Sequence, residues 1–179
     1  MASIIKSNTY ADFNGREILT ANNDGALTTQ KILYPAFYGR LASNQTLSRG
    51  VETKITPFTT NEIDTDSAFD GTTFTVPSDK AGNYFITAQV FCDFESAGND
   101  GESMYLDIDK NQSRVSRSQF NMSGSARLVK YNSLNTSVII PCVAGDEIEV
   151  FAFIADNSAS GTLNIGATNS FFQGFRLGS

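Results

Sequence analysis

Apolar and polar residues alternate along many short stretches of the chain, which is the pattern of β-strands that bury one face. The longest such stretch runs from Tyr84 to Phe94. One of its faces is predicted to lie in the core and carries Tyr84, Ile86, Ala88, Val90 and Cys92. The opposite face mixes aromatic and polar residues, so we expect it to meet a partner subunit; it carries Phe85, Thr87, Gln89, Phe91 and Asp93.

Shorter stretches with strand-like patterns follow one another at fairly regular spacing: 37–41, 54–58, 74–77, 105–109, 137–140, 147–153 and 170–177. In the fourth of these, Leu106 and Ile108 are predicted to point inward. No window has convincing helical periodicity. Many short strands separated by turn residues predict an all-β sandwich or barrel.

Residues 1–34 have a different character from the rest. Strands are predicted at 4–9 and 16–20, with a tight turn at Asn14-Gly15 between them. Such a segment is too small and too polar to hold a core alone, so it is expected to pair with something larger. We interpret 1–34 as an attachment or assembly segment and 35–179 as a globular head. The expected attachment residues are Ile4, Ile5, Ile18 and Leu19.

Composition and charge narrow the function classes. The chain has 179 residues, a formal net charge of −6, 14 Phe and no Trp. A net negative chain is not expected to bind nucleic acid or an anionic membrane, since both need a basic face. The first residues lack the long apolar core of a signal peptide, so synthesis in a cytoplasm is expected.

The two cysteines, Cys92 and Cys142, lack the spacing of metal ligands and are too few for a disulfide framework. Both lie among apolar residues. They are interpreted as small buried hydrophobic residues, with one disulfide between two strands as the alternative.

The sequence lacks residue combinations that catalysis commonly uses. There is no histidine, which removes Ser-His-Asp and Cys-His nucleophile systems. Asp107 and Asp109 share a strand face with Tyr105 and could form a carboxylate pair, but a solvated polar face is the favoured interpretation. The protein is therefore not expected to be an enzyme.

Two charged stretches are candidate binding sites. Asp64, Asp66 and Asp70 lie in the densest acidic stretch, 63–70, and could hold calcium through hard oxygen ligands; a polar connecting loop is the alternative. No other cofactor is expected. A basic stretch could face anionic host glycans or an acidic neighbour, or could be ordinary solvated charge; it holds Arg114, Arg117, Arg127 and Lys130.

Several motifs in the head resemble one known superfamily. The stretch 71–77 (GTTFTVP) and then 81–85 (AGNYF) resembles the signature of the complement globular-head and tumour-necrosis-factor superfamily. The stretches 138–140, 145–150 and 172–177 follow in that superfamily's order. The resemblance implies a jelly-roll β-sandwich and packing of aromatic residues around a three-fold axis. A homotrimer is thus expected, with an interface that includes Tyr38, Phe85, Phe91, Phe151, Phe153, Phe171 and Phe175.

The first part of the chain resembles a different group. The stretches 5–9, 13–20 and 23–25 are similar to the opening of structural proteins from marine and freshwater phages, which often end in a globular-head domain. The resemblance implies a virion-surface structural protein, made in the host cytoplasm. We expect a capsid decoration (cement) protein whose first 34 residues bind the major capsid protein or another virion protein.

The alternative is the receptor-binding head of a short tail or head fibre, which recognises a host surface glycan or protein. Its site is expected in the loops at 96–102 or 122–127, where Gly, Asn and Ser offer adaptable hydrogen bonding.

Overall fold

The computed structural model describes residues 35–60, 62–93, 101–121, 131–156 and 162–178, together with three short strands in the first 34 residues. The chain divides into two compact units, Met1–Tyr34 and Pro35–Ser179. The first unit contains an antiparallel sheet of β1 (Thr9–Ala11), β2 (Glu17–Ala21) and β3 (Leu27–Thr28), with β2 in the middle.

The predicted strand at 16–20 corresponds to β2, while residues 4–8 of the other predicted strand lie outside the described residues. Ile18 and Leu19 lie on β2; Ile4 and Ile5 are not described. The attachment role of these four residues stays a prediction.

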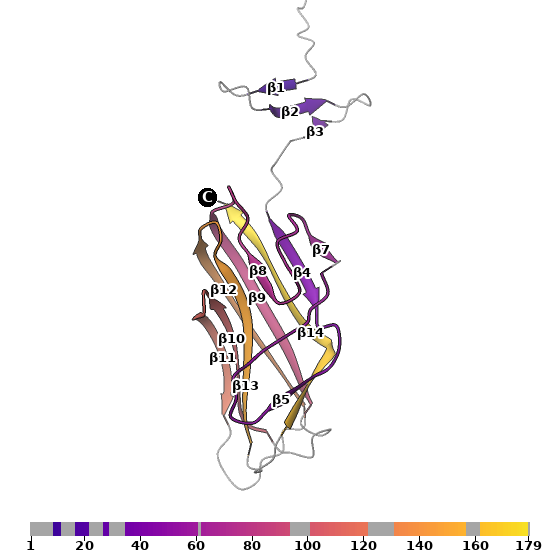
Figure 1. Ribbon diagram of the computed structural model, residues 1–179, viewed down its shortest axis with the longest axis vertical. Coiled ribbons are helices and arrows are strands. Elements are labelled where there is room, and N and C mark those ends of the chain that lie inside the picture. Colours follow the sequence, from indigo (N-terminus) through magenta and orange to yellow (C-terminus); the bar gives the residue numbers. More distant parts are fainter. Residues whose placement is uncertain are drawn as a thin grey trace, which may run out of the picture. The chain divides into compact units, whose positions relative to one another are not determined.

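The second unit, the head, is a sandwich of two antiparallel sheets (Figure 1). The six-stranded sheet has the order β12-β9-β14-β4-β7, and β5 pairs with another part of β14. Its strands are β4 (Ala36–Arg40), β5 (Gln45–Ser48), β7 (Ile63–Asp64), β9 (Gly82–Asp93), β12 (Tyr131–Cys142) and β14 (Thr162–Gly178). The five-stranded sheet has the order β11-β10-β13-β6, and β8 also pairs with β13. Its strands are β6 (Thr53–Lys54), β8 (Thr73–Thr75), β10 (Gly101–Lys110), β11 (Ser113–Asn121) and β13 (Glu147–Asp156).

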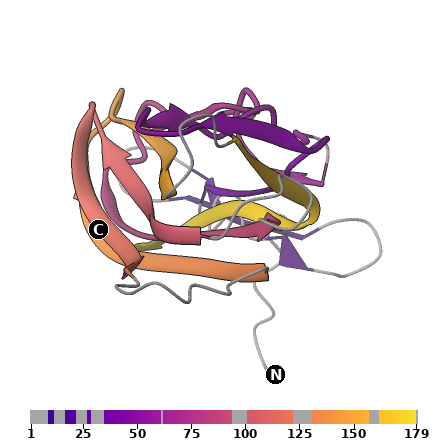
Figure 2. The same ribbon diagram turned by 90° about the horizontal axis from the view of Figure 1, so that it is seen from below.

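The long strands pass between the two layers in jelly-roll order: β9 belongs to the six-stranded sheet, β10 and β11 to the other, and β12, β13 and β14 then alternate. Figure 2 views the head from below, with the strands of both layers around a common interior. The prediction of an all-β jelly roll is confirmed. Every described element is a strand, so the described residues include no helix that could cross a membrane.

The inward faces follow the predicted alternation. Tyr84, Ile86, Ala88, Val90 and Cys92 of β9 are all fully buried, and the predicted inward residues of β10, Leu106 and Ile108, are buried against them from the other sheet.

A cluster of phenylalanines fills one part of this core around Phe172 on β14. Its ring centroid lies 4.8 Å from that of Phe37, 5.8 Å from Phe58 and 5.6 Å from Phe69. Gly174, two residues further along β14, leaves room for the ring of Phe37: a Cβ there would lie 2.8 Å from that ring and 2.5 Å from Ile86. The glycine is therefore required by the close approach of its neighbours rather than by a turn.

Both cysteines are buried and free, as the favoured interpretation expected. The Cys92 thiol contacts the sulfur of Met104 at 2.9 Å across the core. Burial raises the pKa of Cys142 to about 11 and raises that of Cys92 as well. Neither thiol is poised to ionise near neutral pH.

The Phe172→Ala substitution should lower the free energy of unfolding by about 3–5 kcal/mol, because it removes a fully buried ring from a packed cluster. Urea denaturation of both proteins measures the change. Val51→Ala is the control, since the Val51 side chain is 52% exposed and should cost less than about 0.5 kcal/mol. Similar losses in the two variants would contradict the assignment of Phe172 to the centre of the core.

Candidate functional site

Among the described residues of the head, the outward face of the six-stranded sheet carries most of the aromatic residues that do not lie in the core. Strand register places them there: Phe175 of β14 lies opposite Phe85 of β9, and Phe85 lies opposite Ile139 of β12. We call this surface the aromatic face; its residues are Tyr38, Ile63, Phe85, Phe91, Tyr131, Ile139, Phe171 and Phe175.

The aromatic rings on this face contact one another in pairs. The centroids of Phe85 and Phe175 are 5.5 Å apart, and those of Tyr38 and Phe171 are 6.2 Å apart. Phe91 stacks on Tyr131 at 5.9 Å with an angle of 12° between the rings. Among the described strands of the head, no further layer lies above this face, so the rings are covered mainly by one another.

One group of apolar side chains lies at the end of the sheet where the head begins. There Ile139, Phe85, Phe175 and Ala36 form a row across four adjacent strands. Ile139 is 62% exposed and Phe175 is 46% exposed. A row of apolar side chains continuous across four strands is unusual on a surface that faces only water.

Five of the seven predicted interface residues lie on the aromatic face: Tyr38, Phe85, Phe91, Phe171 and Phe175. The structure places the other two, Phe151 and Phe153, on the outward face of the five-stranded sheet, on the opposite side of the sandwich. The predicted set is therefore divided between two surfaces. Its role in an interface stays a prediction.

Sequence reasoning missed Ile139, Tyr131 and Ile63 as surface apolar residues. Ile139 lies in an apolar run, Val138-Ile139-Ile140, in which the pattern does not tell the inward side from the outward. A signal for its outward position was present upstream. Alternate positions of the same strand hold the polar residues Ser133, Asn135 and Ser137, and these share a face with Ile139.

The outward face of the five-stranded sheet is covered by its own charged side chains. Arg117 of β11 makes a bidentate ion pair with Asp107 of β10, with its Nε 2.6 Å from Asp107 Oδ1 and its Nη2 on Oδ2. The guanidinium carbon lies 3.5 Å from the centroid of the Tyr105 ring, which stacks on Phe153 at 4.7 Å. Glu52 accepts a hydrogen bond from the Tyr105 hydroxyl at 3.2 Å.

This arrangement corrects the interpretation of Asp107, Asp109 and Tyr105 as a solvated polar face. Asp107 is only 1% exposed, because the Arg117 side chain lies over it. The structure also changes the interpretation of the basic stretch, because the Arg117 side chain is already paired with Asp107. Arg114 is exposed, whereas Arg127 and Lys130 lie outside the described residues.

Asp109 is the carboxylate of this surface whose surroundings disfavour its charged form. It lies opposite Glu149 on one side and Arg114 on the other, and its Oδ1 is buried without a hydrogen-bond partner among the described residues. Burial is the main reason that the pKa of Asp109 is raised above its ordinary 3.8, and repulsion from Asp107, Glu52 and Glu149 adds to it. Arg114 acts in the opposite direction.

The acidic stretch uses its carboxylates to hold its own backbone. Asp64 accepts hydrogen bonds from the amides of Ala68 and Phe69, at 2.9 and 3.1 Å. Asp70 accepts from the amides of Thr72 and Thr73, both at 2.7 Å. Asp66 accepts from the hydroxyl of Thr65. Within the described part of the chain, no three acidic or cysteine side chains come together as a metal site. Calcium binding at Asp64, Asp66 and Asp70 stays a prediction.

The loops in which the host-binding site was predicted, 96–102 and 122–127, lie almost wholly outside the described residues.

Comparison with solved structures shows the fold of the head. The Eiger tumour-necrosis-factor protein of S. frugiperda aligns with a TM-score of 0.58 at 11% identity, over 82% of this chain and 94% of that one. Murine APRIL at pH 5.0 aligns with a TM-score of 0.57 at 15% identity, over 80% and 99%. The globular domain of zebrafish complement 1qA gives a TM-score of 0.48 at 16% identity, over 80% of this chain and 97% of that one. No protein-family model and no curated protein sequence matches the chain. The head is thus a jelly roll of the tumour-necrosis-factor type.

The Asp109→Asn substitution should raise the melting temperature at pH 7. Because the folded pKa lies above the unfolded one, ionised Asp109 destabilises the fold at every pH above the folded pKa. The gain should shrink as the pH falls through that value and disappear at about pH 3, where the carboxyl is protonated in both states.

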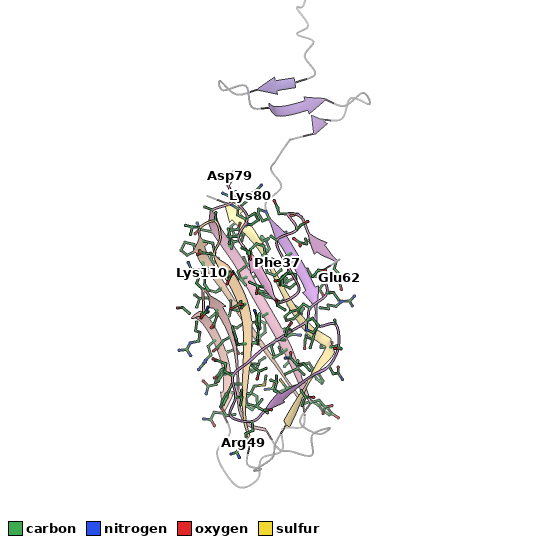
Figure 3. The ribbon with its side chains drawn as sticks, in the orientation of Figure 1. Phe37, Arg49, Glu62, Asp79, Lys80 and Lys110 are labelled. Atoms are coloured by element: carbon green, nitrogen blue, oxygen red, sulfur yellow. The ribbon has the colours of Figure 1, made fainter. Side chains whose placement is uncertain are left out.

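Thermal melts at several pH values measure this profile. Asp79→Asn is the control, because Asp79 is exposed in a turn at the end of the head and Asn tolerates its φ of 62° (Figure 3). A gain that does not vary with pH, or a loss at pH 7, would contradict the account of Asp109.

Proposed function

We propose that this protein is a homotrimeric structural protein of the virion surface of a tailed phage, with a capsid decoration role. The observation that carries the self-association is the apolar row on the aromatic face, in which Ile139 and Phe175 are exposed and Phe85 and Ala36 are half-buried. Aromatic side chains are enriched in the buried centres of protein interfaces, and a second copy of the chain offers complementary apolar surface.

A closed ring of copies is the form of assembly that suits this head. In a cyclic oligomer every copy uses its contact surfaces and no open end remains, whereas an open head-to-tail contact would grow into filaments. The number three comes from the superfamily that the head motifs resemble.

The phage assignment rests on the resemblance of residues 5–25 to the opening of phage structural proteins. The proposed partner is the major capsid protein or another virion protein, bound through the first unit by strand addition.

The second candidate is the receptor-binding head of a short tail or head fibre. A cavity beside Arg40, described in the next subsection, favours it. The two functions are compatible, because a decoration protein can also carry a binding site.

The double substitution Phe175→Asp and Ile139→Asp should convert the trimer to a monomer without unfolding the head, because both side chains are largely exposed in the single chain. Light scattering coupled to size-exclusion chromatography measures the mass, and circular dichroism checks the fold. The control is Val51→Asp, because the Val51 side chain is 52% exposed and the residue lies in the connection between β5 and β6. A wild-type chain that is monomeric at micromolar concentration would refute the proposal.

Quantitative mass spectrometry of purified virions tests the proposed location. Hundreds of copies per particle are expected for a decoration protein. A small multiple of three or six would assign the protein to a fibre instead, and its absence from particles would contradict both candidates.

A further inference from the structure

The last strand of the head, β14, contains a wide bulge near its middle. Gly166 lies opposite Phe91 of β9, and Phe171 lies opposite Gln89, so the four residues between them face Val90 alone. The Ser170 side chain repairs the interrupted ladder: its Oγ accepts from the Phe91 amide at 2.9 Å and donates to the Gly166 carbonyl at 2.7 Å. The Ser170 side chain thus ties the bulge to β9 and to the start of the bulge itself, and bulges often lie beside binding sites.

An open cavity of about 360 Å³ lies beside this bulge, and its lining is Arg40, Leu41, Ala42, Thr59, Glu62 and Ala167. Arg40 and Glu62 supply its charges. Arg40 is the last residue of β4, and Glu62 lies beside β7 at the free edge of the six-stranded sheet (Figure 3). The volume of the cavity is in the range of a site for one sugar residue or another small molecule.

The polar groups of the cavity are held in place before any ligand arrives. Arg40 Nε donates to Glu62 Oε1 at 2.8 Å, and the Thr59 hydroxyl donates to the same oxygen at 3.2 Å. Thr59 Oγ1 in turn accepts from the Arg40 amide at 2.9 Å. Among the described residues, no acceptor is bonded to the two terminal nitrogens of Arg40, whose side chain is 59% exposed. The cavity therefore offers guanidinium donors next to a carboxylate acceptor.

An aromatic surface adjoins these polar groups. Phe171 lies directly opposite Arg40 in the strand register and on the same outward face, and its ring packs beside that of Tyr38. Both rings are partly exposed. A flat apolar surface next to a paired donor and acceptor matches a sugar ring, which has an apolar face of C–H groups and a rim of neighbouring hydroxyls.

We propose that the cavity formed by Arg40, Thr59 and Glu62 beside Phe171 binds a neutral sugar residue of a glycan. Two neighbouring hydroxyls fit the site, one accepting from the Arg40 guanidinium and one donating to Glu62. Phe171 lies opposite Arg40 on β14, outside the residues that line the cavity, and the apolar face of the sugar ring would reach it only by extending past Arg40.

The charge balance of the site selects against acidic sugars. Arg40 and Glu62 cancel each other, and Glu62 would repel a carboxylate or sulfate placed against the guanidinium. The site therefore differs in place and in chemistry from the two loops and the basic stretch that the sequence indicated.

The inference deepens the second candidate function and does not depend on the trimer. Phe171 lies four residues from Phe175 along β14, which is about 13 Å in an extended strand. Contacts between copies through the apolar row can therefore leave the cavity open.

Saturation-transfer NMR and isothermal titration on the full chain test the proposal, with methyl α-glucoside, methyl β-galactoside and N-acetylglucosamine as neutral probes. Glucuronate and inorganic sulfate are the anionic probes. At least one neutral probe should bind with a Kd on the order of 1 mM, as single sugars typically require multivalency for strong binding. The oligomeric state is measured in the same sample, so failure of the trimer and failure of the sugar site are separate results.

Arg40→Gln and Glu62→Gln should each weaken binding of the neutral probe about tenfold, since each removes a charged hydrogen-bonding group from the site. Arg114→Gln, at an exposed position on the other sheet, is the matched control and should leave binding unchanged. Unchanged melting temperatures establish that the variants are folded.

Three results would overturn the proposal. The first is that no neutral probe binds. The second is that sulfate or glucuronate binds more tightly and Glu62→Gln strengthens that binding, which would define an anion site. The third is that Arg114→Gln weakens sugar binding as much as Arg40→Gln does.

Discussion

The central strand β9 pairs with a neighbour on each side, and its side chains must alternate between the two faces of the sheet. Its inward residues are all fully buried in the core. The burial of the inward residues forces Phe85 and Phe91 onto the outward face, where no second layer among the described strands of the head covers them. A slip of one residue would move the whole inward set to the surface, so the core and the aromatic face are fixed by the same register. The proposed self-association follows from this constraint, because it buries the apolar row of Ile139, Phe85, Phe175 and Ala36 that folding leaves open on this face.

Strand alternation also places aromatic residues on the outward face of the five-stranded sheet, but there other side chains cover them. Two of its outward aromatic residues, Tyr105 and Phe153, stack on each other, and Arg117 lies over Tyr105 while it pairs with Asp107. A buried carboxylate needs such a partner, because the loss of water around it is costly. The two faces of the sandwich thus differ: one covers itself with charged side chains, and the other exposes apolar ones. This asymmetry favours the six-stranded sheet over the other as the surface that meets a second copy.

Much of the fold could be predicted from the sequence because strand alternation is a local property. The inward sets on β9 and β10 were predicted correctly for that reason, as was the jelly roll, which the order of the Gly71–Pro77 and Ala81–Phe85 motifs indicated. The burial of Asp107 could not be predicted, since it depends on which residue of β11 lies opposite it. The cavity at Arg40 was missed because it needs the bulge in β14, and Arg40 and Glu62 are brought together only by the pairing of β4 with β7.

Hydroxyl-radical footprinting of the wild-type chain, compared with the exposure of each side chain in the single head, tests the central claim most directly. The aromatic residues supply the probes: Phe85, Phe91 and Phe175 on one sheet, and Tyr105, Phe151 and Phe153 on the other. The account predicts that Phe85 and Phe175 react far less than their exposure in the single head implies, and that dilution restores their reactivity. The reactivities of Phe151 and Phe153 should not change with protein concentration. Full reactivity of Phe175 in the concentrated protein, or protection confined to Phe151 and Phe153, would contradict it.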